Sequence, residues 1–158
     1  MSVMFQAPGK LYLVGEYAVV EAGYPAVIAA IDRYVTVKIE TAVVGTIWST
    51  QQKNLTVNWE RDEEGKICVD KDHPYALLVS ALQVTEDYLY QSGVTISESY
   101  AVAITSQLDH DESGHKYGLG SSGAVTVAVV GAVLAHYGVS LSPLHLYKLA
   151  VLSQLELG

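Results

Sequence analysis

A loop of glycines and serines stands immediately before the longest apolar run of this 158-residue chain. Glycine lets a backbone turn sharply and approach a ligand closely, and the N–H groups at a helix start lack partners and favour negative charge. A phosphate group suits such a place, and a serine hydroxyl can bind it or reach Mg²⁺. A tight turn whose serines only cap a helix explains the same residues, so the loop alone leaves both interpretations open. The loop consists of Gly118, Leu119, Gly120, Ser121, Ser122 and Gly123.

Three well-known loops with similar residues do not fit this segment. The letters match G-x-G-x-x-G, but dinucleotide folds need a strand running directly into the first glycine and an acidic residue about 20 positions later. Here a charged loop separates Thr105 from Gly118, and no carboxylate lies between Gly138 and Leu144. No lysine follows the glycines as in a Walker-A loop, and neither serine is the centre of G-x-S-x-G.

A second candidate site lies near the N-terminus, in APGKLYLVGEYAVV. Lys10 follows Pro8-Gly9 at the expected start of a strand, so its ammonium group can project near a strand end. Glu16 either orients Lys10 or caps the turn that closes the strand. An ordinary edge strand with one exposed lysine is the alternative interpretation.

Together and in this order, the two segments resemble the GHMP kinases, a superfamily of small-molecule kinases that includes the galactokinases, homoserine kinases and mevalonate kinases. Within it, GKLYLVGEYAVV, IDRYVTV and KYGLGSSGAV are most similar to the phosphomevalonate kinases. Mevalonate kinases more typically show GEHAVVHG where this chain has GEYAVVEAG, and the GEHTDY of galactokinases is absent. The resemblance covers essentially the whole chain, and the two motifs together are more specific than either one.

The resemblance implies an α/β (α+β) fold, a ribosomal protein S5 domain 2-like two-layer sandwich. Residues 1–158 would form the N-terminal, ATP-binding domain of a GHMP kinase, with the C-terminal domain absent from this chain. The implied reaction transfers the γ-phosphoryl group of ATP to mevalonate 5-phosphate and gives mevalonate 5-diphosphate, a step of isoprenoid biosynthesis. Mevalonate kinase, or another small-molecule kinase of the superfamily, is the alternative.

The same resemblance implies a role for each candidate residue. The loop from Gly118 to Gly123 would wrap the phosphates of ATP, and Ser122 would also lie on Mg²⁺. Lys10 would face the transferring phosphoryl group or the phosphate of the acceptor. Lys116 directly precedes the loop and can add positive charge there, although an exposed lysine without a function explains it equally.

The elements that must position these residues follow from the periodicity of the sequence. Alternating and β-branched runs predict strands, and polar turns between three of them favour a meander. Apolar spacing with ordinary start and stop residues predicts helices, with Ser121 or Ser122 as the cap of the second and Gly138 at its end. The predicted strands are Val3–Phe5, Lys10–Val14 (around a bend or bulge at Ala7-Pro8-Gly9), Ala26–Ile31, Tyr34–Ile39, Thr46–Ser49, Leu55–Trp59, Lys66–Val69 and Ser99–Thr105, and the predicted helices are Pro74–Gln91, Ser121 to about His136 and Pro143–Leu157.

The third predicted helix is apolar on nearly every face, and such a helix must be enclosed by other elements. We expect that a missing C-terminal domain or a partner chain covers it. The family carries an acidic residue after this helix and a third glycine-rich motif in its C-terminal domain, and neither is present here. We therefore expect the 158-residue chain by itself to be inactive or nearly so.

The composition narrows the classes of partner. Half of the residues are hydrophobic and 16% are charged, which excludes wholesale disorder. The formal charge of −8 argues against generic binding to nucleic acid. No apolar run reaches the roughly 18 residues of a membrane span, no secretory signal pattern is seen, and the single Cys68 cannot form an internal disulfide. These features favour the cytoplasm, no membrane partner and a buried or half-buried thiol.

Two other interpretations remain. Asp109, His110, Asp111, Glu112 and His115 superficially resemble a metal cluster, but metal ligands are usually fixed on ordered elements, so we expect a solvated loop. The alternative of another class is a non-enzymatic α/β interaction module whose glycine loop is only a turn and whose last helix docks a partner.

Overall fold

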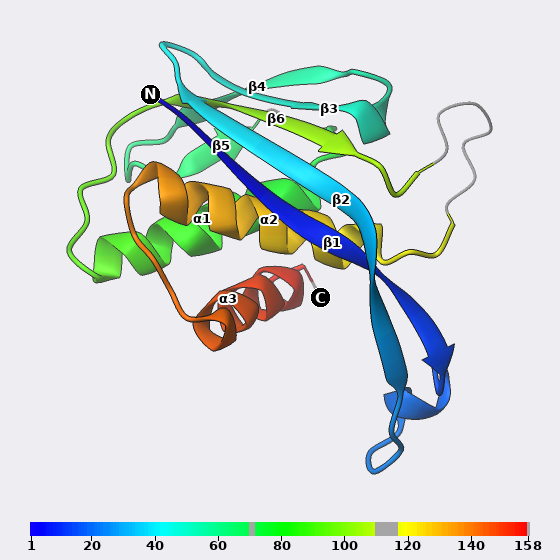
Figure 1. The fold of residues 1–158 in the computed structure, drawn as a ribbon. Coiled ribbons are helices and arrows are strands. Elements are labelled where there is room, and N and C mark those ends of the chain that lie inside the picture. Colours follow the sequence, from blue (N-terminus) through cyan, green and yellow to red (C-terminus); the bar gives the residue numbers. More distant parts are fainter. Residues whose placement is uncertain (70–71, 110–116, 158) are drawn as a thin grey trace.

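Alternating apolar and polar residues in the first two thirds of the chain build a mixed sheet, and the helices cover one of its faces (Figure 1). The computed structural model describes residues 1–69, 72–109 and 117–157. Helices α1 (Ala76–Gln91) and α2 (Ser121–His136) pack beside each other beneath the sheet, and α3 (Pro143–Leu155) packs on both of them. This confirms the expected α/β fold class. The sheet has the order β1-β2-β6-β3-β4-β5, with strands β1 (Ser2–Val14), β2 (Val27–Thr41), β3 (Gly45–Ser49), β4 (Thr56–Arg61), β5 (Ile67–Val69) and β6 (Tyr100–Ser106).

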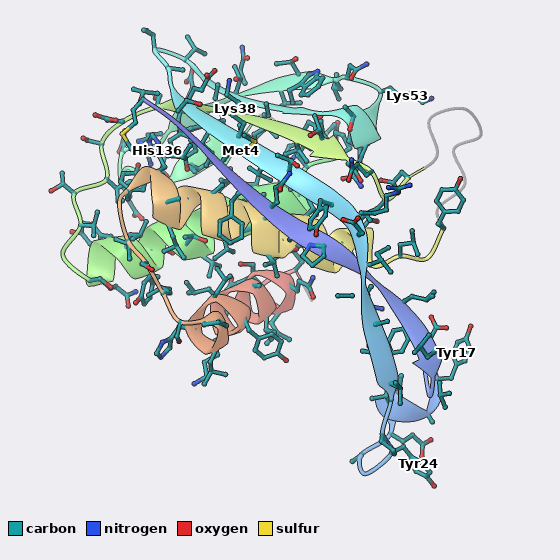
Figure 2. All side chains as sticks on the ribbon, viewed as in Figure 1. Met4, Tyr17, Tyr24, Lys38, Lys53 and His136 are labelled. Atoms are coloured by element: carbon teal, nitrogen blue, oxygen red, sulfur yellow. The ribbon has the colours of Figure 1, made fainter. Side chains whose placement is uncertain are left out.

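The first two strands form one long antiparallel hairpin. The four short strands predicted here join into two, but the pairing register shifts between Pro8 and Lys10, so the predicted bulge is confirmed. The distal end of the hairpin, with a short 3₁₀ turn at Ala18–Val20, projects beyond the helices (Figure 1). Figure 2 shows Tyr17 and Tyr24 on this projecting end, and both side chains are exposed.

The other strands confirm the predicted meander, but the place of β6 in the sheet was not predicted. β3, β4 and β5 pair in sequence order as antiparallel strands. β6 lies between β2 and β3, antiparallel to the first and parallel to the second. Periodicity alone cannot reveal this insertion, because β4, β5 and α1 separate β6 from β3 along the chain, and β3 as well separates it from β2.

The core lies between the sheet and α2. The inward residues of β2, Val35, Val37 and Ile39, are fully buried, as the alternation predicts. Gly131 of α2 faces the ring of Phe5 on β1, and a Cβ at that position would lie 2.5 Å from the ring. A side chain there would push α2 away from β1, so this glycine helps to fix the helix that begins at the glycine-serine loop.

The prediction that a serine caps α2 is wrong. The N-cap is Gly120, whose φ of 72° is left-handed, and no side chain caps the helix. Ser121 and Ser122 are instead the first two residues of α2. The predicted end is confirmed, because Gly138 has a φ of 69° and the next N–H, of Val139, donates to the carbonyl of Leu134 at 2.8 Å.

The prediction of a buried or half-buried Cys68 is also wrong, since the thiol is exposed. β5 is a short strand at the edge of the sheet, and side chains alternate along a strand. Ile67 takes the inward position and is 2% exposed, so the next residue faces outward.

α3 has one face buried against the other helices and one face exposed. Leu149, Ala150 and Ser153 are buried, whereas the exposed apolar side chains on this helix are Leu144, Tyr147, Leu152 and Leu155. No other described part of the chain covers these four, as the apolar pattern led us to expect. No helix among the described residues combines the length and the apolar character that a membrane crossing requires.

Candidate functional site

The glycine-serine loop turns into α2 through two left-handed residues. Gly118 has a φ of 70° and Gly120 a φ of 72°. L-amino acids with a side chain rarely adopt this conformation, so the glycines make the turn possible at low energetic cost. The turn brings the N-terminus of α2, with its partial positive charge, to the surface of the molecule.

The backbone N–H groups of this turn are open. The first intrahelical bond of α2 runs from the N–H of Ala124 to the carbonyl of Gly120, at 3.0 Å. Within the described residues, the N–H groups of Ser121, Ser122 and Gly123 donate no hydrogen bond. Ser122 and Gly123 are exposed, and nothing lies within 4 Å of where a Cβ of Gly118 or Gly123 would be. Unpaired N–H groups around open space suit an anion.

Lys10 lies directly against this loop. Its backbone N–H donates to the carbonyl of Leu119 at 2.9 Å, and a Cβ on Gly120 would lie 2.7 Å from its Cγ. Gly9 allows the approach, because a Cβ there would lie 2.9 Å from the Leu119 carbonyl oxygen and 2.5 Å from Cδ2 of Leu108. The structure thus brings together the two segments that the sequence singled out.

The ammonium group of Lys10 lies over an aromatic ring. Its Nζ is 3.7 Å from the centroid of the Tyr12 ring. Tyr12 is not among the site residues that the sequence pattern indicates. The signal that could have found it is spacing, because residues two apart on a strand share a face.

The charged residues near the loop leave Lys10 without an ionic partner among the described residues. The ion pairs of the described residues join Lys38 to Glu40 and Arg61 to Glu86, so Glu16 forms no ion pair with Lys10. The carboxylate of Asp109 accepts hydrogen bonds from the Gln51 amide and, at 3.2 Å, from the Ser106 hydroxyl. Lys116, His110, Asp111, Glu112 and His115 lie outside the described residues.

The described residues beside the loop match what a phosphate-bound Mg²⁺ ion, which the resemblance implies, requires of a protein. No group of three His, Cys, Asp or Glu side chains suited to a metal occurs in the part of the chain that the structure describes. Mg²⁺ that accompanies nucleotide phosphates needs only one or two protein ligands, because phosphate oxygens and waters complete its shell. The exposed hydroxyl of Ser122 at the open end of α2 fits that role.

Comparisons with known proteins agree with this geometry. Residues 76–158 match the family model described as the GHMP kinases N terminal domain. The chain is 36% identical over 168 residues to a phosphomevalonate kinase of Streptomyces sp. (strain CL190), covering 99% of this chain and 44% of the relative. It is also 36% identical over 159 residues to a mevalonate kinase of Thermococcus sibiricus, covering 94% of this chain and 43% of that protein.

Solved structures give the same result. The Streptococcus pneumoniae phosphomevalonate kinase in complex with phosphomevalonate and AMPPNP superposes with a TM-score of 0.82 at 30% identity, covering 99% of this chain and 43% of that one. The chain therefore spans less than half the length of these relatives.

Proposed function

The chain belongs to the GHMP kinases, and we propose on this basis that the complete protein transfers the γ-phosphoryl group of ATP to mevalonate 5-phosphate. The observation that carries the proposal is the contact of Lys10 with an open, amide-lined loop at the start of α2. The similarity to a structure described with phosphomevalonate and AMPPNP supports the choice of nucleotide and acceptor.

The chemistry of this transfer defines what the protein must do. An oxygen of the acceptor phosphate forms a bond to the γ-phosphorus, while the bond to the bridging oxygen breaks and ADP leaves with that electron pair. The acceptor is already ionised at neutral pH, so little general-base catalysis is needed. The protein must hold two mutually repelling anions in line and neutralise the charge on the equatorial oxygens.

The described residues can perform these tasks. In this proposal the open N–H groups of Ser121, Ser122 and Gly123 bind the ATP phosphates, and the absence of side chains at Gly118 and Gly123 leaves room for them. Lys10 faces the transferring phosphoryl group or the acceptor phosphate and stabilises the charge that develops there. Lys116, outside the described residues, is proposed to add positive charge beside the loop.

Ser122 is the residue proposed to hold Mg²⁺, through its hydroxyl oxygen. When bound, the ion would offset phosphate charge that the loop amides and Lys10 do not. The orientation of the phosphates is set in this proposal by the N–H groups of the chain.

Mevalonate itself is the second candidate acceptor, because the T. sibiricus mevalonate kinase is as similar in identity as the phosphomevalonate kinase. The two acceptors are distinguished by measuring ADP release by the complete polypeptide with each compound. We expect the higher kcat/KM with mevalonate 5-phosphate, and a preference for mevalonate would replace the proposed acceptor.

The part of the protein beyond this chain is proposed to supply much of the acceptor site and to cover α3. This follows from the length of the relatives, of which the chain covers 44% and 43%. The 158-residue chain by itself is therefore expected to transfer phosphoryl groups very slowly or not at all.

Nucleotide binding by the chain tests the loop directly. We expect weak binding of Mg·ATP to the wild-type chain, measured by calorimetric titration, and loss of that binding in Gly120→Val. The substitution forces a β-branched side chain into a left-handed φ of 72° and against the stem of Lys10.

Gly93→Val is the matched control. Gly93 also has a left-handed φ, of 86°, but nothing lies within 4 Å of its Cβ position and it follows the end of α1. It should lose similar stability through backbone strain and keep nucleotide binding. Equal affinity in Gly120→Val and the wild type would contradict the proposed phosphate site.

A further inference from the structure

Lys10 and Tyr12 share one face of β1. Lys10 pairs with Ala30 and Tyr12 with Ile28 on β2, so the two side chains stand next to each other along the strand. The Nζ of Lys10 lies 3.7 Å from the centroid of the Tyr12 ring. This is within the range at which an ammonium group is attracted by the negative face of an aromatic ring.

The rest of Lys10 is also held in place. Its backbone N–H is bonded to the carbonyl of Leu119, and its methylene stem lies against Gly120, whose added Cβ would be 2.7 Å from Cγ and 3.1 Å from Cε. The side chain is thus restrained at the backbone, along the stem and at the charged end. A lysine without such restraints samples many rotamers, and ordering them costs free energy when a ligand binds.

The chemistry of the ring matters for a lysine that must meet phosphate. The chain carries 17 acidic residues against 9 basic ones, so carboxylates are abundant, yet no ion pair engages Lys10 within the described residues. A carboxylate partner would neutralise the ammonium and compete with phosphate. An aromatic ring attracts the cation without a formal charge, so an arriving anion can draw the ammonium away.

We propose that Tyr12 is a positioning residue that holds the ammonium of Lys10 beside the glycine-serine loop and releases it to incoming phosphate. The inference rests on the proposed phosphoryl transfer. The hydroxyl of Tyr12 forms no hydrogen bond within the described residues, so the role belongs to the ring, and phenylalanine should replace it.

The resting contact is tested in the 158-residue chain by NMR, without any need for activity. Lysines are reductively methylated with ¹³C, and the signal of Lys10 is assigned from its loss in Lys10→Arg. We expect that signal to be shifted upfield by the ring in the wild type and in Tyr12→Phe, and to be unshifted in Tyr12→Leu. Addition of inorganic tripolyphosphate should move the wild-type signal toward the unshifted position.

The positioning role is tested in the complete polypeptide by steady-state kinetics. Tyr12→Leu should lower kcat by about three- to tenfold, within the range of cation–π contributions, with less change in the KM for ATP. Tyr12→Phe should restore kcat to within about twofold of the wild type. Tyr90→Leu, on α1 and 74% exposed, is the control and should leave kcat unchanged.

The outcomes separate this inference from the function on which it rests. An unshifted Lys10 signal in the wild type, or equal kcat in the wild type and Tyr12→Leu, would overturn the role of Tyr12 while leaving the kinase proposal intact. A wild-type polypeptide that transfers no phosphoryl group to either acceptor would overturn the proposed function, and the role of Tyr12 with it.

Discussion

Lys10 and Lys38 both lie on the hairpin of β1 and β2, but different groups surround their ammonium ends. Lys38 is paired with Glu40 at 2.6 Å, and the hydrogen bond and positive charge of this lysine lower the pKa of the Glu40 carboxyl. The ammonium of Lys10 instead lies over the ring of Tyr12, and its methylene stem packs against Gly120 at the start of α2. A net charge of −8 for the whole chain therefore does not prevent a locally positive site.

Lys10→Ala in the complete polypeptide should lower kcat by about two or more orders of magnitude, because the proposed role is to stabilise charge that develops in transfer. The affinity for ATP should change little, since the loop N–H groups would still bind the phosphates. Steady-state kinetics and nucleotide titration measure the two effects separately. Lys38→Ala is the control, because it removes an exposed charge on the neighbouring strand β2. Wild-type turnover in Lys10→Ala would rule out the proposed role of Lys10.

A buried polar network ties α1 to the sheet at the end of α2 opposite the loop. Arg61 of β4 donates two hydrogen bonds of 2.8 Å to Glu86 of α1, and Tyr100 of β6 donates one of 2.9 Å to the same carboxylate. Glu86 raises the pKa of Arg61 through these hydrogen bonds. Burial is the main cause that raises the pKa of Tyr100 well above its ordinary value. The hydroxyl therefore stays protonated and donates.

Glu86→Ala should destabilise the chain strongly, by about 3–5 kcal/mol, because it leaves the buried guanidinium without its carboxylate. The side chains of Arg61 and Glu86 are only 14% and 7% exposed, so water cannot readily replace the lost partner. Urea unfolding of the wild type and the variant measures the change in the free energy of unfolding.

Asp87→Ala is the matched control, since Asp87 is the next residue on α1 and is exposed. It should change the free energy of unfolding by less than about 0.5 kcal/mol. If the two variants had equal stability, the network would contribute nothing beyond a surface ion pair.

The sequence predicted the elements that depend on local patterns. Alternation and apolar spacing predicted the meander and the three helices, and proline and glycine predicted the bulge beside Pro8 and the end of α2 at Gly138. The insertion of β6 between β2 and β3 could not be predicted, because pairing between distant strands leaves no periodic signal. The serine cap was wrong because the left-handed Gly120 already turns the chain into the helix.

For the candidate site, as for the fold, the sequence predicted the local features but not the contact between distant segments. The residue types of the loop and Lys10 indicated phosphate chemistry, but their contact depends on two close approaches, at Gly9 and Gly120, that only coordinates reveal. Tyr12 was missed because a tyrosine in a strand is ordinarily explained by packing. Its position over the ammonium follows from the register of β1.

Exposed apolar side chains gather in two places, on the projecting end of the hairpin and on the outer face of α3 (Figures 1 and 2). Large exposed apolar patches usually mark an interface. The relatives are more than twice as long as this chain, so the rest of the protein is the partner proposed for α3.

This proposal predicts opposite effects of one double substitution in two settings. Tyr147 and Leu152 on α3 are 62% and 50% exposed in this chain. Changing both to glutamine, a neutral helix former, should reduce self-association and dye binding of the 158-residue chain, because apolar surface is removed from water. In the complete polypeptide the same change should lower stability by roughly 2–5 kcal/mol, because the two side chains would be buried there.

Sedimentation velocity of the chain and urea unfolding of the complete polypeptide measure the two effects. Val43→Gln is the control, because this turn residue is 99% exposed and lies away from α3. Unchanged stability of the complete polypeptide would mean that its additional half leaves this face of α3 open to solvent.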